Sequence, residues 1–135
     1  MALRGAALLS LAVLLPGCGH KPAAEEPPSA EAKAYVSNLK LSEVAMKATE
    51  NYAGGVVTEI EGKITNAGNK TVDYAAVACI FHDSLNQMVL RERVAIVKTP
   101  LKPGETRGFR LPFDNIPESW NNQMPQIVIA QIRLL

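Results

Sequence analysis

The sequence has no excess of charge of either sign. The formal net charge is +1, and removing residues 1–17 takes away only Arg4, which leaves 13 basic and 13 acidic side chains. Proteins that bind nucleic acids usually carry a basic surface that displaces the counterions of the phosphate backbone. Because this chain lacks such a charge balance, we expect no nucleic-acid partner.

The sequence also lacks the familiar motifs of catalysis and cofactor binding. It contains no glycine-rich phosphate loop, paired-cysteine motif, zinc-protease helix motif or nucleophile elbow. His82, Asp83 and Ser84 have the residue types of a nucleophilic triad, but three consecutive side chains cannot converge as a triad requires. We therefore predict that the protein is not an enzyme and binds no cofactor.

Long hydrophobic runs are absent as well. The apolar stretch Ala6–Leu15 follows Arg4 and has ten residues, whereas a membrane-spanning helix needs about 20. A short apolar run after a basic residue is typical of a secretory signal peptide. We therefore predict that residues 1–17 are a signal peptide and that residues 18–135 form the mature protein.

The end of this segment, Leu15-Pro16-Gly17-Cys18, resembles the lipobox of bacterial lipoprotein precursors. The resemblance implies that Cys18 is lipidated and becomes the new N-terminus, so that a lipid anchor holds the protein in the membrane of the cell envelope. Gly19 is not the aspartate that resembles an inner-membrane retention signal. This favours the outer membrane over the inner one, with the protein facing the periplasm.

Residues 18–34 are rich in proline, alanine and glutamate and contain no large apolar side chain. Such a segment cannot bury enough surface to offset its ordering entropy, which predicts a disordered tether. A short helix over Ser29–Lys33 is a competing interpretation. The folded domain is expected at residues 35–135.

From Tyr35 onward, short β-rich runs alternate with turn residues. Val56, Ile60 and Ile64 fall on one face of a predicted strand, and Thr71–Asp83 is apolar on both faces, as expected of a central strand. The pattern predicts an all-β protein with an immunoglobulin-like antiparallel β-sandwich of about seven strands. The other predicted strands are 35–41, with a bulged continuation to Met46 or a helical turn over Ser42–Glu50, then 88–97, 106–113 and 126–135, and a short helical turn is predicted over 116–123.

The segment Val77–Asp83 resembles the strand that names the FxLYD-type domains, which are small immunoglobulin-like sandwiches of bacterial envelope lipoproteins. Cys79, Phe81, His82 and Asp83 stand at its four named positions. The stretches 61–68 and 101–109 resemble the Gly-then-Asn turn and the Leu-x-Pro-Gly turn of the same family. The resemblance implies a fold but no particular activity.

Three residues are candidates for an interaction surface. Trp120 is the only tryptophan and lies among asparagines, so it is either a recognition anchor or a cap on the sandwich core. Arg91 and Arg93 share one face of a predicted strand and form either a cationic stripe or surface ion pairs.

Metal binding by Cys79 and His82 is disfavoured, because residues three apart on a strand point to opposite faces. We therefore predict no metal site. The favoured interpretation is a non-catalytic, lipid-anchored envelope lipoprotein whose sandwich acts as a structural module or binds an envelope protein. The alternative is a periplasmic protein that binds a small ligand or a metal.

Overall fold

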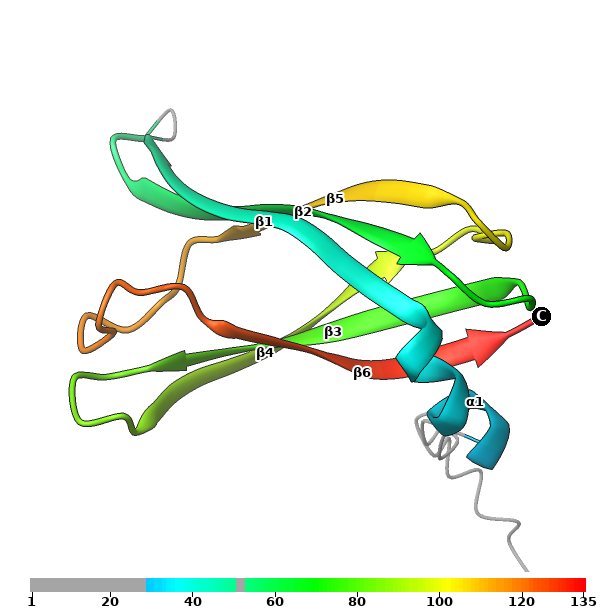
Figure 1. Cartoon of the computed structure of the whole chain (residues 1–135). Coiled ribbons are helices and arrows are strands. Elements are labelled where there is room, and N and C mark those ends of the chain that lie inside the picture. Colours follow the sequence, from blue (N-terminus) through cyan, green and yellow to red (C-terminus); the bar gives the residue numbers. More distant parts are fainter. Residues whose placement is uncertain (1–28, 51–52) are drawn as a thin grey trace, which may run out of the picture.

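The computed structural model describes residues 29–50 and 53–135. The predicted signal peptide, Cys18 and residues 19–28 of the predicted tether lie outside this part, as do Asn51 and Tyr52. The described chain forms two antiparallel sheets packed face to face, with strand orders β1-β2-β5 and β4-β3-β6 (Figure 1). The strands are β1 (Leu39–Glu50), β2 (Val56–Asn66), β3 (Val72–His82), β4 (Met88–Val97), β5 (Thr106–Phe113) and β6 (Gln126–Leu134).

This architecture confirms the predicted all-β sandwich. The described residues contain six strands where about seven were predicted. The first strand starts later than expected and then continues as one strand to Glu50. A bulge between Ser42 and Ala45 shifts its register, and Glu43 takes a positive φ of 52° there. The bulged continuation was therefore the correct alternative.

The hydrophobic core lies between the sheets and follows the predicted alternation. Ile60 and Ile64 of β2 are fully buried. Val56, which was assigned to the same face, is 64% exposed because it begins the strand beyond the edge of the core. Strand β3 is central in its sheet, as predicted, and its residues from Ala75 to Cys79 are all buried.

The chain enters the sandwich through a short helix, α1 (Ala30–Tyr35), and a 3₁₀ turn, η1 (Val36–Asn38). The hydroxyl of Ser29 accepts a hydrogen bond from the Ala32 amide (3.1 Å) and caps the helix. Ala32 and Tyr35 are buried in the core. The structure thus has a short helix where the sequence left a choice between a helix and a disordered tether. Residues 30–34 join the folded unit because Ala32 and Tyr35 anchor α1 in the core.

A buried polar cluster holds α1 in place. Asn66 is fully buried, and its Oδ1 lies 2.7 Å from the Tyr35 hydroxyl. Its amide nitrogen donates to the carbonyls of Lys70 (2.7 Å) and Leu101 (3.0 Å). A Cβ at Gly68 would lie 2.2 Å from the Tyr35 hydroxyl oxygen, so this turn requires glycine. The cluster ties the entry helix to two turns of the sandwich.

The predicted helical turn near Trp120 is a series of turns without a helix. The Trp120 amide donates to the Pro117 carbonyl (3.0 Å), and Trp120 forms an isolated β-bridge with Asp83. Within residues 29–50 and 53–135, no helix is both long and apolar enough to span a bilayer.

Candidate functional site

The three predicted interaction residues do not come together in one site. Trp120 packs on the core side, at one end of the sandwich, with its ring edge-on to Phe81 (centroids 5.5 Å apart). Its indole nitrogen is buried and has no hydrogen-bond partner among the residues that the structure describes. The contacts therefore agree with Trp120 as a cap on the core.

Arg91 and Arg93 lie on the opposite, outward face of the same sheet. They pair across the strands with Ile80 and Ala78 of β3, and paired residues in an antiparallel sheet point to the same side. Cys79 and Phe81, which alternate with these positions, belong to the core. Both arginines are exposed.

We call this outward surface of the β4-β3-β6 sheet the arginine face. At its centre, Ala76 and Ala78 are fully buried although they point away from the core, because longer side chains of the flanking strands cover them. Arg93 donates to the side-chain oxygen of Gln131, a contact that spans β3. The face comprises Tyr74, Ala76, Ala78 and Ile80 of β3, Arg91 and Arg93 of β4, and Val128, Gln131 and Arg133 of β6.

The charge of the arginine face is unbalanced. Arg133 pairs with Asp73 (2.7 Å), and its guanidinium carbon lies 5.6 Å from the centroid of the Tyr74 ring. The side chain of Arg91 has no hydrogen-bond or ion-pair partner among the described residues. The exposed, unpaired guanidinium of Arg91 therefore leaves a positive charge on this outward surface.

The outer surface of the other sheet, β1-β2-β5, carries more charges and pairs most of them internally. Lys47 contacts Glu61 (2.8 Å), and Arg110 contacts both Glu59 (2.7 Å) and Glu61 (3.0 Å). The hydrogen bond from Lys47 holds the pKa of Glu61 below its ordinary value. These acidic and basic groups neutralise one another across the sheet.

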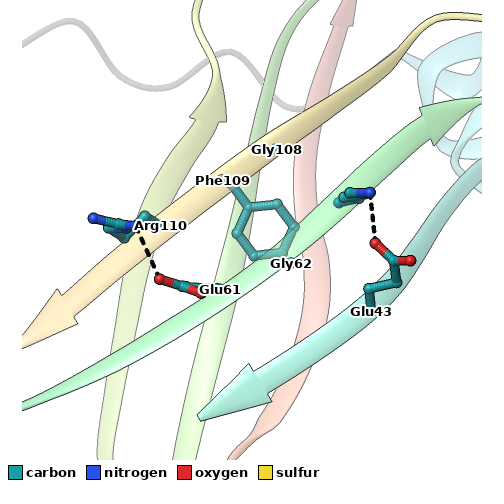
Figure 2. Close-up of a pocket in the computed structure, with 7 residues that line it drawn as sticks. Glu43, Glu61, Gly62, Gly108, Phe109 and Arg110 are labelled. Carbon is teal, nitrogen blue, oxygen red and sulfur yellow. Dashed lines mark ion pairs between the residues drawn. The ribbon is translucent and has the colours of Figure 1, made fainter. Parts of the chain in front are cut away.

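A shallow hollow of about 420 Å³ lies on this second surface (Figure 2). It exists because Gly108 has no side chain beside the charged residues. The ion pairs Glu43–Lys63 (2.6 Å) and Glu61–Arg110 flank it. The charged side chains that line the hollow already form ion pairs with each other. The hollow therefore offers a ligand few interactions other than shallow surface contact.

Cys79 is enclosed in the core and has no exposed surface. Burial, and to a smaller degree the charge of Glu92, raises the pKa of its thiol to about 11. His82, three residues along β3, is half-buried. In the part of the chain that the structure describes, no group of three or more histidine, cysteine, aspartate or glutamate side chains is arranged to hold a metal ion.

Asp83 organises the turn after β3. Its Oδ1 accepts hydrogen bonds from the amides of Leu85 (2.9 Å) and Gln87 (2.8 Å). Asn86 takes a positive φ of 60° in this turn, a conformation that asparagine tolerates better than most residues. Asp83, at the end of the segment Val77–Asp83, therefore has a structural role.

Sequence reasoning missed the contribution of β6 to the arginine face. Gln131 and Arg133 are 38 and 60 residues from their side-chain partners Arg93 and Asp73. The strand register that joins them cannot be read from the pattern of β6 alone. The one available signal was the small Ala76 and Ala78 on the outward face of an otherwise bulky central strand.

Comparisons with known proteins add little to this description. No family model and no curated protein matches the chain. Among solved structures, it is similar to a Bordetella pertussis protein that carries the provisional name ApaA. That match has 18% sequence identity, covers 72% of this chain and 93% of the other, and has a TM-score of 0.39. A likeness of this size indicates neither a shared family nor a shared function.

Proposed function

We propose that this protein is a lipid-anchored lipoprotein of the cell envelope. In this proposal Cys18 carries the lipid, and the anchor holds the protein in the outer membrane with the sandwich facing the periplasm. The sandwich is a non-catalytic module that binds an envelope protein through the arginine face. The anchor rests on the signal-peptide pattern and the lipobox-like residues 15–18.

The observation that carries the binding role is the contrast between the two outer surfaces. The β1-β2-β5 sheet pairs most of its charges internally, with Lys47 and Arg110 both bound to Glu61. The arginine face leaves Arg91 exposed and without a partner among the described residues. An exposed cation next to small, covered residues suits a partner surface that presents carboxylates, because complementary charge guides association and fixes orientation.

The proposal is tested by reversing the charge of the arginine face. The double variant Arg91→Glu/Arg93→Glu should lose the proteins that are captured by chemical cross-linking in whole cells. A matched control is Lys40→Glu/Lys102→Glu, which makes the same change in net charge at exposed lysines elsewhere. The control should capture the same proteins as the unaltered chain.

Two results would contradict the binding role. One is an unchanged set of captured proteins in the arginine double variant, although the variant is folded and present at normal abundance. The other is an equal loss in both double variants, which would indicate a general effect of net charge.

A further inference from the structure

The four edge strands of the sandwich differ in how far they are protected against pairing with another strand. An edge strand exposes unpaired amide and carbonyl groups, and proteins usually block it with charges, proline or bulges. In β1, the bulge at Glu43 and the lysines at 40 and 47 do this. In β5, Pro112 has no amide hydrogen to donate, and Arg107 and Arg110 add charge.

Strand β4 is protected in a similar way. It carries the consecutive charges Arg91, Glu92 and Arg93 near its middle. Its pairing with β3 is shifted at two places, next to Ala76 and next to His82, so the strand is irregular toward both ends. These features disfavour a regular ladder with another chain.

Strand β6 has no protective charge or proline over residues 126–130, although its register with β3 also shifts, at Ala130 and between Arg133 and Leu134. This segment reads Gln-Ile-Val-Ile-Ala, without charge or proline. Among the described strands β6 pairs only with β3, so its other edge is open. Pro125 precedes the segment, and the register shift between Ile129 and Gln131 falls on its last residue, Ala130. Helix α1 contacts β6 and lies beside its C-terminal end (Figure 1).

We propose that residues 126–130 of β6 pair antiparallel with the same residues of a second copy of this chain. A strand that pairs with itself in this way has a two-fold axis at its centre, here Val128. Ile127 then lies opposite Ile129 of the second copy, and Gln126 lies opposite Ala130. No like charges face each other, so the segment is complementary to itself.

This register also agrees with the two faces of the sheet. Ile127 and Ile129 pack against the core, whereas Val128 pairs with Ala78 on the arginine face. Directly opposite residues in an antiparallel pair point to the same side. Pairing about Val128 therefore places the core-facing sides of the two β6 strands on the same side of the joined sheet. The two copies then form one continuous sheet, and their arginine faces lie next to each other.

The inference concerns the open edge of β6. Val128 at this edge also belongs to the arginine face, but the pairing does not require Arg91 or Arg93. It also differs from the lipid anchor, because pairing of β6 needs no membrane. The experiment therefore uses positions on the edge itself, and its failure would leave the results for Cys18 and for the arginine face unaffected.

The test is thiol cross-linking of the full chain in cells that express it. Val128→Cys places two thiols opposite each other at the proposed axis, and a short bis-maleimide should join them into a product with twice the mass of one chain. Ala45→Cys is the matched control, since Ala45 is exposed on an edge strand and pairs with outward-facing Glu61. The control and the unaltered chain should give no such product.

A second pair of variants checks the register. Gln126→Cys and Ala130→Cys, on differently tagged copies in the same cells, should give a joined product of the two tags. Gln126→Cys alone should give much less, because residue 126 does not face itself. Equal products from Val128→Cys and Ala45→Cys would overturn the proposal. So would the absence of a product in folded, protease-resistant protein, or a product that contains a different protein.

Discussion

At the scale of single residues, Asp83 is the clearest case of a side chain that acts on its own backbone. It accepts two amide hydrogen bonds in the turn between β3 and β4, from Leu85 and Gln87. We expect Asp83→Ala to lower the free energy of unfolding by about 1 kcal/mol, because two donors lose their acceptor. Chemical denaturation of the full chain measures this change.

The control for this turn is Asp83→Asn. Asparagine keeps a side-chain oxygen at the same position and should retain most of the stability. If Asp83→Ala unfolds at the same denaturant concentration as the unaltered protein, the two hydrogen bonds contribute nothing and the account of the turn is wrong.

Cys79 gives a second prediction at this scale. Its thiol is buried and has a pKa raised to about 11, so it should stay protonated and react slowly in the folded protein. Alkylation followed by mass analysis of the peptide that contains Cys79 should show little labelling at neutral pH, and complete labelling in denaturant. Rapid labelling of the folded protein would contradict the core position.

The same pKa shift has a consequence for stability. The folded pKa of Cys79 lies above the ordinary value of 9.0, so deprotonation favours the unfolded chain. The contribution of the thiol to stability is present below pH 9 and is lost as the pH rises toward about 11. Cys79→Ala should remove this pH dependence, at a cost of about 1 kcal/mol for the lost packing of the sulfur.

At the scale of elements, the β2–β5 pair contains two glycines in opposite situations. A Cβ at Gly62 would lie 2.5 Å from a ring carbon of Phe109, whereas a Cβ at Gly108 would meet nothing closer than 3.9 Å. We expect Gly62→Ala to destabilise the domain by about 1 to 3 kcal/mol through overpacking. Gly108→Ala should be neutral or slightly stabilising, because alanine restricts the unfolded chain.

Thermal unfolding of the two alanine variants tests this difference. Adding Phe109→Leu to Gly62→Ala should recover part of the loss, because leucine has no ring atom at the point of the clash. Equal melting temperatures for Gly62→Ala and Gly108→Ala would contradict the close packing of Phe109 on β2.

The elements also show what could be predicted from the sequence. The central position of β3 was predictable because both of its faces are apolar, and β2 was predictable because Ile60 and Ile64 alternate with charged residues. Helix α1 was assigned mainly to the tether, because its six residues offer only Ala32 and Tyr35 as anchors. The burial of Tyr35 depends on Asn66, 31 residues away.

The candidate site was predictable only in part. Arg91 and Arg93 were placed on one face by their spacing, and the structure shows both exposed on the same surface. The sequence did not show that Trp120 lies apart from the two arginines, because this depends on its packing against Phe81, which is 39 residues away. Gln131 joined the site only through the register of β6 with β3.

At the scale of the whole molecule, the protein is a sandwich with a buried core between its sheets, and the unpaired Arg91 lies on the outer surface of one sheet. The entry helix α1 is held to the body by Tyr35 and Asn66. Any tether that precedes Ser29 therefore pulls on a buried, hydrogen-bonded anchor. This arrangement suits a folded module attached to a surface through its N-terminal side.

The central claim is the lipid anchor at Cys18, and separation of membrane and soluble fractions from cells that express the full chain tests it directly. The unaltered protein should be found in the membrane fraction, because acyl chains contribute about 0.8 kcal/mol for each buried methylene. Cys18→Ser removes the thiol that receives the lipid and should release the protein from the membrane fraction. Membrane retention of Cys18→Ser as a processed chain, without its signal peptide, would contradict the account.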